Sequence, residues 1–365
     1  MRRLVTLALL AALFAAGMAF AAASAAAQLA PAAATSSPAS ASTTGPAPKV
    51  SPADQKRIAA IQQYQHDLVT VVALRAEPDY LLGAAILAKP FDFKTPGLDF
   101  DALSARAAAA PGAGPAPHWA RLAACKTQAD CPNAKAFAYL KKHAAGNAAV
   151  WLIALDVAAE NHDAKAEQAA LRKAADAQIY DDYYGKALAG VAKAVAVLPP
   201  RADTTTGAHD GQPDNPEGVR VLVAVNAAQA LPRPELAPVV ALCDKDAVAH
   251  DQRARKECLK LAHTLQWGSS PIARAAGLHI RGQLDPADQA STEQASRDLA
   301  WQVQQYSALL QRSLTDPTQA SRWLATARNG GTELSLILAT LRANGVSLTA
   351  PADASAPASA GSADQ

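Results

Sequence analysis

Residues 147–175 read NAAVWLIALDVAAENHDAKAEQAALRKAA and contain two helical patterns separated by a short polar run. Asn147 can cap a helix whose apolar residues return every three or four positions over 150–158. The polar run 160–163 interrupts this pattern, and a second helical pattern with its own apolar side begins directly after it. Two helices joined by so short a turn must pack antiparallel, so the stretch predicts a helical hairpin.

A hairpin of this size leaves apolar surface uncovered and needs similar neighbours to bury it. Half of the 365 residues are hydrophobic, yet aromatic residues make up only 5% of the chain. Alanine supplies much of the hydrophobic half, and it favours helix while burying little area per residue. The sequence therefore predicts an all-α fold, an irregular array of about a dozen helices in hairpins.

The first 27 residues have the layout of a secretory signal peptide. An arginine pair precedes an apolar run over 4–20, small residues follow, and cleavage is expected between Ala25 and Gln28. A membrane anchor is the alternative, but the run is short for a span and no stop-transfer charge follows it. The Ala-rich signal predicts an exported protein of the bacterial periplasm, with a eukaryotic secreted protein as the alternative.

The charge of the mature chain is balanced. The 34 basic residues include two in the signal, which leaves 32 basic residues against 32 acidic ones. A balanced chain has no electrostatic surplus with which to attract nucleic acid or anionic lipid. No later segment has the uninterrupted apolar length of a membrane helix. We therefore expect no nucleic-acid partner and no membrane span after the signal is cleaved.

Composition divides the chain into a signal (1–27), an Ala/Pro/Ser tether (28–50), an N-terminal helical region (51–198), a loop or linker (199–217), a C-terminal helical region (218–348) and a tail (349–365). The tether and the tail have almost no bulky side chains, so we expect them to be disordered. Ser51 and Pro52 suit the cap and the first position of the first helix. The Pro-rich segment after 198 marks either a loop within one array or a boundary between two domains.

Apolar periodicity and capping residues predict further helices at 102–110, 118–125, 132–143, 219–231, 235–243, 251–265, 271–284, 286–314, 317–328 and 332–344. Residues 219–225 also alternate like a strand. No second strand pattern is available to pair with this one, so helix is the better interpretation.

The hairpin resembles a tetratricopeptide repeat. Trp151 matches the tryptophan of that repeat's first helix, and His162-Asp163 matches its Gly-Asp turn. Leu171 and Ala174 match the bulky and small positions of its second helix. The resemblance implies a tetratricopeptide-like hairpin within the array and implies no particular substrate.

The match to this repeat is divergent. Leu155 stands where the repeat has Gly or Ala, Glu167 stands where it has a small residue, and no Pro follows the second helix. Residues 132–151 resemble the end of a preceding repeat, but no second copy is found in register. The array is therefore expected to be irregular.

Four cysteines in an exported chain predict two disulfides, for which three pairings are possible. Nearness in the sequence favours Cys125 with Cys131 and Cys243 with Cys258. On one continuous helix the second pair would lie about 22 Å apart, beyond the ~7 Å limit between bonded Cα atoms. The chain must therefore reverse within 244–251, which predicts another hairpin.

Zinc is the alternative role for the second cysteine pair. Cys243, His250, Cys258 and His263 are all zinc-ligand types, but their spacing matches no compact zinc motif. An oxidising compartment favours disulfides over zinc thiolates. We therefore predict structural disulfides, no metal and no cofactor.

No catalytic motif is present in the sequence. The serine-hydrolase elbow, the phosphate-binding Gly loop, the haem-attachment CxxCH and the HExxH helix are all absent. His143 and His162 could form an acid/base set with Asp156, Asp163 or the acidic pair 181–182, but each of these stands at a helix end or turn, where solvated polar residues are usual. An enzyme is therefore the less favoured class.

Two other features could bind a ligand. Loop 209–214 has oxygen ligands but lacks the closing Glu of a calcium loop. The five tryptophans lie beside apolar neighbours, which predicts core or hairpin contacts, although exposed ones could form a carbohydrate platform.

The sequence as a whole predicts an exported soluble helical-repeat protein that acts as a protein- or peptide-interaction scaffold in the cell envelope. Stacked helical hairpins present grooved surfaces that suit such partners. Two alternatives remain open. One is an envelope enzyme with an unrecognised all-α site, in a pocket with several of His118, His143 and His162; the other is a carbohydrate or cell-wall binder that uses exposed Trp.

Overall fold

The computed structural model describes residues 51–125, 127 and 130–352. Fifteen α-helices occupy these residues: α3 (Pro52–Val72), α4 (Pro78–Ala88), α5 (Phe100–Ala109), α6 (Pro115–Ala120), α7 (Ala134–His143), α8 (Ala148–Glu160), α9 (Ala164–Ala175), α10 (Tyr184–Ala194), α11 (Pro216–Ala228), α12 (Ala237–Leu242), α13 (Gln252–Gln266), α14 (Pro271–Leu284), α15 (Gln289–Thr315), α16 (Pro317–Arg328) and α17 (Glu333–Ala343). These residues contain one isolated backbone bridge, between Asn147 and Ile179, and no strand. The prediction of an all-α fold is confirmed, while a tetratricopeptide-like arrangement stays a prediction.

Several sequence predictions concern residues that the structure does not describe. The signal peptide at 1–27, the tether at 28–50 and most of the tail lie outside the described residues. Within the described ranges, no helix is both long enough and apolar enough to cross a membrane.

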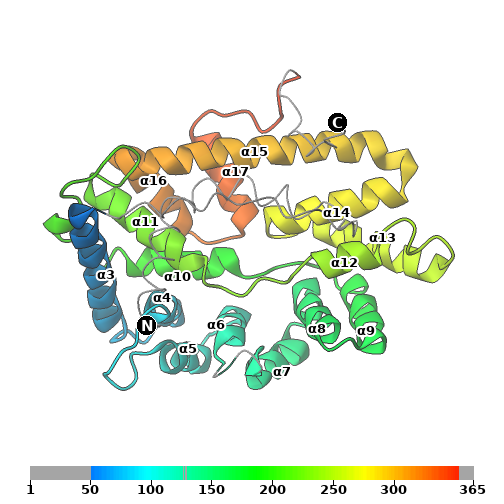
Figure 1. Cartoon of the computed structure of the whole chain (residues 1–365), viewed down its shortest axis with the longest axis horizontal. Coiled ribbons are helices and arrows are strands. Elements are labelled where there is room, and N and C mark those ends of the chain that lie inside the picture. Colours follow the sequence, from blue (N-terminus) through cyan, green and yellow to red (C-terminus); the bar gives the residue numbers. More distant parts are fainter. Residues whose placement is uncertain (1–50, 126, 128–129, 353–365) are drawn as a thin grey trace, which may run out of the picture.

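The helices follow an elongated path around the molecule (Figure 1). Helix α3 stands at one end of the long axis, and α4 to α9 follow one another along one long edge. Helices α13 and α14 form the other end, and the long helix α15 returns along the opposite edge to α16 and α11. Helices α10 and α17 lie between the two edges.

Helices α8 and α9 form the hairpin that the sequence predicts. Asn147 accepts a hydrogen bond from the Ala149 N–H at the start of α8, and Asp163 accepts one from the Ala166 N–H at the start of α9. Between the helices, His162 turns the chain in the left-handed region, at φ 54°. Other helices cover the hairpin, because α9 packs on α13 and α8 contacts α12.

Two large apolar cores stabilise the array. The first includes buried residues of α3, α4, α10, α11 and α16, among them Trp323, and the second includes residues of α6 to α9 and α12 to α14, among them Trp119. The first core contains Val191 before segment 199–217 and Val219 after it. Burial of these apolar side chains supplies most of the free energy that favours folding.

Glycines let α4 and α10 cross at close range. A Cβ atom added at Gly83 would lie 2.3 Å from the carbonyl oxygen of Gly190, and one added at Gly190 would lie 2.7 Å from that of Asp79. Neither position accepts a side chain unless a helix backbone moves. These glycines therefore allow the backbones of α4 and α10 to come into direct contact.

Both predicted cysteine pairs lie at disulfide distance. The Cα atoms of Cys125 and Cys131 are 5.4 Å apart, and those of Cys243 and Cys258 are 5.5 Å apart. The chain reverses between α12 and α13, as the spacing of the second pair requires. This second pair is completely buried and therefore joins the two helices within the core.

Some predicted elements differ in extent. The helix expected at 118–125 starts earlier, as α6, and ends in a 3-10 turn at Arg121–Ala123. Pro115 fixes φ at the start of α6, which explains the earlier beginning. Helix α12 is shorter than the expected 235–243, and α11 confirms that the strand-like run is helical. Within the tail predicted from 349, the Ala350 N–H donates to the Asp298 carboxylate of α15 (2.9 Å).

Candidate functional site

Helices α10, α14 and α17 begin next to one another, and polar side chains gather where they meet. The Ser269 N–H donates to the Tyr180 carbonyl (3.0 Å), and the Leu334 N–H donates to the Ser269 carbonyl (3.0 Å). The central polar cluster is defined here as Tyr180, Asp182, Tyr184, Arg233, Ser269 and Glu333. Helix N-termini carry partial positive charge, so this meeting point favours carboxylates.

Asp182 ties the start of α10 to the turn before α14. Its Oδ1 atom accepts hydrogen bonds from Ser269 Oγ (3.0 Å) and from the Tyr184 N–H (3.3 Å). Its own N–H donates to the same serine hydroxyl (3.1 Å). The side chain is only 2% exposed, and its Oδ2 atom has no hydrogen-bond partner. Asp182 is therefore a buried carboxylate with one unused acceptor.

Arg233 and Glu333 form an ion pair within the central polar cluster. The Arg233 Nη2 atom lies 3.4 Å from Glu333 Oε1, and the guanidinium lies over the Tyr184 ring, 4.5 Å from its centroid. The Glu333 Oε2 atom has no hydrogen-bond partner. Burial raises the pKa of Glu333 to about 7, against the attraction of Arg233 and with added repulsion from Asp182.

Segment 229–236, between α11 and α12, contains Arg233 of the central polar cluster and forms hydrogen bonds with several other helices. Its carbonyl oxygens accept hydrogen bonds from Lys89 and from the Trp119 indole, and the Glu235 N–H donates to Asp156 (2.9 Å). The segment therefore connects α4, α6 and α8 with the ion pair at the start of α17. Figure 1 shows this connection crossing the middle of the molecule to α12.

Asp156 is a second carboxyl group with a strongly raised pKa. Burial raises the pKa of Asp156 to about 7, although the Glu235 N–H bond opposes this shift. Its Oδ1 atom has no hydrogen-bond partner. A carboxyl group that titrates near neutral pH can act as a general acid or base, so Asp156 and Glu333 have the protonation behaviour that such catalysis requires.

Tyr183 holds a strained backbone conformation between the two aspartates and α10. Its φ of 55° lies in the left-handed region, which is unfavourable for a bulky side chain. The turn lets Asp181 accept a hydrogen bond from the Tyr183 N–H (2.8 Å), and the phenol ring packs near Trp119. Next to this turn, Asp182 accepts hydrogen bonds from Ser269 and from the Tyr184 N–H at the start of α10.

An exposed apolar pair lies beside this buried cluster. In the part of the chain that the structure describes, four large hydrophobic side chains are exposed: Leu74, Ile179, Trp267 and Ile272. Ile179 is 56% exposed and Trp267 is 72% exposed. Ile179 precedes Tyr180 in the chain, and Trp267 precedes Gly268. A Cβ atom added at Gly268 would lie 3.0 Å from the Tyr180 ring, so these two segments are in close contact. The pair Ile179 and Trp267 is called the apolar pair below.

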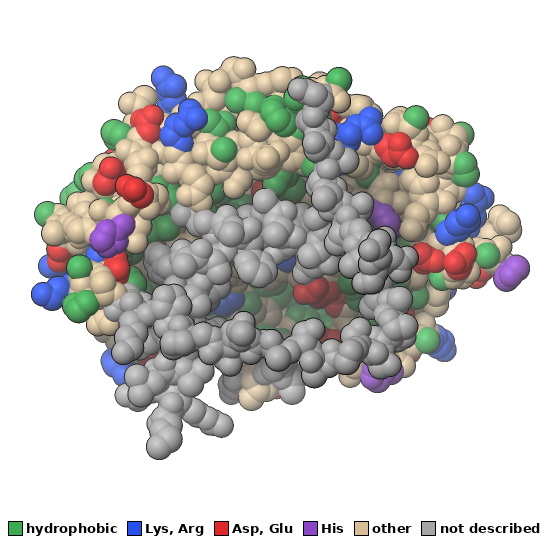
Figure 2. Space-filling view, turned by 45° about the horizontal axis from the view of Figure 1, so that its top comes forward, with side chains coloured by type: hydrophobic (Ala, Val, Ile, Leu, Met, Phe, Trp, Pro, Cys, Tyr) green, Lys and Arg blue, Asp and Glu red, His purple; other side chains and the backbone are tan. Residues whose placement is uncertain are grey.

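The charged surface is mixed. Figure 2 shows side chains of both signs toward the two ends of one face of the molecule. Opposite charges also pair across the surface, as Lys193 does with Asp79 and Arg253 with Glu257. This mixture agrees with the balanced charge of the mature chain.

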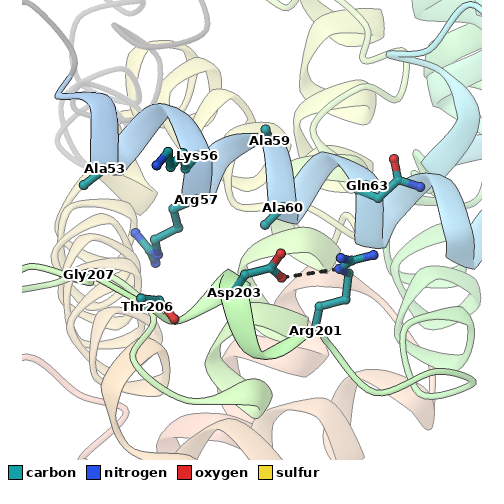
Figure 3. Close-up of a pocket in the computed structure, with 10 residues that line it drawn as sticks. All are labelled: Ala53, Lys56, Arg57, Ala59, Ala60, Gln63, Arg201, Asp203, Thr206 and Gly207. Atoms are coloured by element: carbon teal, nitrogen blue, oxygen red, sulfur yellow. Dashed lines mark hydrogen bonds and ion pairs between the residues drawn. The ribbon is translucent and has the colours of Figure 1, made fainter.

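An open pocket of about 550 Å³ lies between α3 and the loop after α10 (Figure 3). Alanines line its helix side, and Arg201 is paired with Asp203 at 3.4 Å. Arg57 is buried beneath the helix and donates to backbone carbonyls, including that of Thr204 (2.9 Å). Arg57, Arg201 and Asp203 already have partners, so among the described charged side chains of the lining only Lys56 has no ion pair or hydrogen bond, and the pocket offers few contacts that would fix a ligand.

The histidines considered for an acid/base set lie outside the central polar cluster. His143 packs against Tyr139, 4.4 Å between ring centroids, and Tyr139 stacks on His118 at 3.5 Å. His162 forms the exposed turn of the hairpin. Among the described residues, no hydrogen bond or ion pair joins these three histidines to a carboxylate. The structure therefore brings His118 and His143 together on the Tyr139 ring, but it places His162 and the carboxyl groups of Asp156 and the pair 181–182 elsewhere.

The residues that could have bound a zinc ion do not form a metal site. Cys243 and Cys258 are bonded to each other, which leaves His250 and His263 without a thiol partner. Across the described ranges, no group of three or more His, Cys, Asp and Glu side chains is arranged to hold a metal ion. In loop 209–214, His209 lies 3.7 Å from the Asp54 carboxylate.

The tryptophans divide into packed and exposed ones. Trp119, Trp323 and Trp151 are buried, and Trp301 is half-buried with its indole donating to the Ser347 carbonyl (3.0 Å). These four agree with the expected core or hairpin contacts. The same expectation is wrong for Trp267, which ends α13 beside the small Gly268 and points away from the core.

The sequence pattern did not single out Arg233, Ser269 or Glu333. Each comes from a different segment and none belongs to a motif, so only the folded chain brings them together. Local signals existed nonetheless, since Ser269 precedes a Ser-Pro helix start and Glu333 follows the sequence Gly-Gly-Thr.

Comparisons with known protein families, with curated proteins and with solved structures find no match for this chain.

Proposed function

We propose that this protein is an exported scaffold that binds a protein or peptide partner in the cell envelope through the apolar pair. The observation that carries this proposal is the 72% exposure of Trp267 in a molecule that packs its other four tryptophans. Exposed apolar surface costs free energy in water, and tryptophan is enriched among the residues that dominate binding interfaces. The neighbouring Ile179 extends the apolar surface that a partner could cover.

Export is supported by the two cysteine pairs at disulfide distance and by the signal layout of residues 1–27. Expression of the full chain in a bacterial host, followed by fractionation and N-terminal sequencing, tests this part. We expect periplasmic protein that begins between Ala26 and Gln28. Cytoplasmic protein that still carries its first residues would contradict export.

Chemical cross-linking in the intact envelope, followed by mass spectrometry, tests the scaffold function. We expect one partner to be recovered reproducibly with the wild-type chain and to be depleted with Trp267→Ser. Leu74→Ser is the matched control, since Leu74 is 83% exposed and lies outside the apolar pair. Recovery of no reproducible partner, together with turnover in a broad hydrolase screen, would contradict the proposal.

An envelope enzyme is the second candidate, and one observation favours it. Glu333 and Asp156 both have a pKa of about 7 and an oxygen without a hydrogen-bond partner. These oxygens are buried, so a substrate could reach them only if the structure opened. Turnover by the wild-type chain that is abolished in Glu333→Gln or Asp156→Asn would favour the enzyme over the scaffold.

A further inference from the structure

The apolar pair continues into the loop after α7 through backbone hydrogen bonds. The Gly146 carbonyl accepts hydrogen bonds from the N–H groups of Gln178 (3.0 Å) and Ile179 (3.2 Å), and the Ala148 N–H donates to the Ile179 carbonyl (2.8 Å). The loop between α7 and α8 therefore lies beside Ile179. The turn between α13 and α14, which follows Trp267, contacts Tyr180, the next residue along the chain.

Basic side chains border this surface. Lys142 and His143 end α7 and are exposed. Lys173 of α9 lies over the ring of Trp151, 4.2 Å from its centroid, and the indole N–H of Trp151 donates to the Ala145 carbonyl in the same loop (2.7 Å). Over the described ranges, neither lysine has an ion-pair partner. Two unpaired cations thus lie next to the loop that contacts Ile179.

The acidic side chains closest to Ile179 along the chain are already engaged. Asp176 forms an ion pair with Lys260 (3.2 Å), and Asp181 accepts a hydrogen bond from the Tyr183 N–H within its own turn. Asp182 is 2% exposed and belongs to the central polar cluster. In the described part of the chain, Asp176 and Asp181 thus have partners, whereas Lys142 and Lys173 have no ion-pair partner.

We infer that the surface formed by Ile179, Trp267, Lys142 and Lys173 binds a peptide segment in which apolar side chains are combined with carboxylates. This inference rests on the proposed scaffold function and specifies the chemistry of the partner. Exposed apolar side chains are covered best by apolar atoms, and unpaired cations select anions. A peptide fits better than an anionic lipid surface, because the apolar pair lies in turns between helices instead of along an amphipathic helix face.

Fluorescence anisotropy with labelled synthetic peptides tests this inference on the mature full chain. The probes are three short peptides of equal length, composed of Leu and Glu, of Leu and Lys, and of Ser and Glu. We expect the Leu/Glu peptide to bind at least about tenfold more tightly than either other peptide. Added salt should weaken this binding, because exposed charges are screened.

Matched variants locate the binding. Trp267→Ser and the double variant Lys142→Glu/Lys173→Glu should each weaken Leu/Glu binding by about tenfold or more. Leu74→Ser and Lys165→Glu are the controls, since both residues are exposed and lie outside this surface, and they should leave the affinity unchanged. Circular dichroism verifies folding, and Ile179→Ser replaces the Trp267 variant if that chain does not fold.

Three results of the peptide and vesicle measurements would overturn the inference. They are Leu/Lys binding as tight as Leu/Glu binding, equal losses in the control variants, and binding to vesicles of anionic lipid without binding to the Leu/Glu peptide. A cross-linked envelope partner that maps to another surface would also overturn it, while leaving the scaffold function standing. The absence of any envelope partner would instead contradict the scaffold function itself.

Discussion

Ile179 and Tyr180 are consecutive residues that face two different regions of the molecule. Ile179 is 56% exposed and belongs to the apolar pair, whereas Tyr180 is 5% exposed and belongs to the central polar cluster. The exposed region is apolar with a basic border. The buried region is polar, with two carboxylates, one guanidinium and the N-terminal ends of three helices.

The molecule thus has a polar region inside and an apolar region at the surface. The polar groups stabilise the fold, whereas the apolar groups are accessible to a partner. Buried polar groups need their partners within the protein, so breaking one contact of the central polar cluster is costly. Exposed apolar groups contribute little to the folded state and gain most when a partner covers them. Variants of the two regions should therefore act on different properties, the first on stability and the second on binding.

The largest effect should come from the disulfide that holds α13, the helix that ends at Trp267. Replacing both Cys243 and Cys258 by Ala should lower the free energy of unfolding by about 3 kcal/mol, since the bond closes a loop within the core. Urea denaturation under oxidising conditions measures the change. The matched double variant at Cys125 and Cys131 should cost less, about 2 kcal/mol, because its loop is shorter. The opposite order would contradict this account of the core.

The next effect should come from breaking the ion pair of the central polar cluster. Arg233→Met leaves the partly buried Glu333 without its cation and should cost about 2 kcal/mol, less than for a fully buried pair because solvent reaches both side chains. The double variant Arg233→Met/Glu333→Gln should recover part of that loss, which a double-mutant cycle of denaturation curves can measure. Strict additivity of the two substitutions would show that the pair is not coupled.

A smaller effect should appear in the pH dependence of stability. The pKa values of Glu333 and Asp156 are raised to about 7, from ordinary values of 4.5 and 3.8. Their contribution to stability is therefore complete below those ordinary values and is lost as the pH rises through 7. Asp156→Asn keeps an acceptor for the Glu235 N–H and should raise stability at pH 8 by about 1 to 2 kcal/mol, after allowance for solvent screening.

Glu333→Gln should reduce the pH dependence of stability in the same way, since it also removes a buried ionisable group. Thermal unfolding of wild type and both variants between pH 5 and pH 8 measures this effect. Wild-type stability that rises over this range, with both variants following it, would contradict the role given to the two carboxyl groups.

The smallest effect on stability should come from the exposed region. Trp267→Ser should change the free energy of unfolding by less than about 0.5 kcal/mol, because the side chain is 72% exposed. The same variant should lose partner binding, so it separates the two regions most clearly. A stability loss comparable to that of Arg233→Met would place Trp267 within the fold-determining contacts.

Local patterns in the sequence predicted much of the fold. Asn147 and Asp163 cap their helices through their own side chains, and such short-range hydrogen bonds are visible in the sequence. The spacing of Cys243 and Cys258 fixed a reversal of the chain, because a disulfide imposes a distance. Helix ends at α14 and α16 match the predicted residues for the same local reasons.

The candidate sites were much less predictable. The Arg233 and Glu333 pair joins residues 100 positions apart, and no local pattern reports a contact of that range. The exposure of Trp267 depends on how α13, α14 and segment 176–182 pack around Gly268, so periodicity alone assigns it to a core. Tyr183 shows the same limit, since its left-handed conformation is imposed by the surrounding contacts and not by its own preference.

Site-specific photo-cross-linking in intact cells tests whether a partner binds at Trp267. A photoreactive amino acid is placed at position 267 in one chain and at position 74 in a second, and both positions are exposed in the folded protein. We expect one reproducible envelope partner to be cross-linked from position 267 and not from position 74. Cross-linking from position 74 alone, or from neither position, would contradict this expectation.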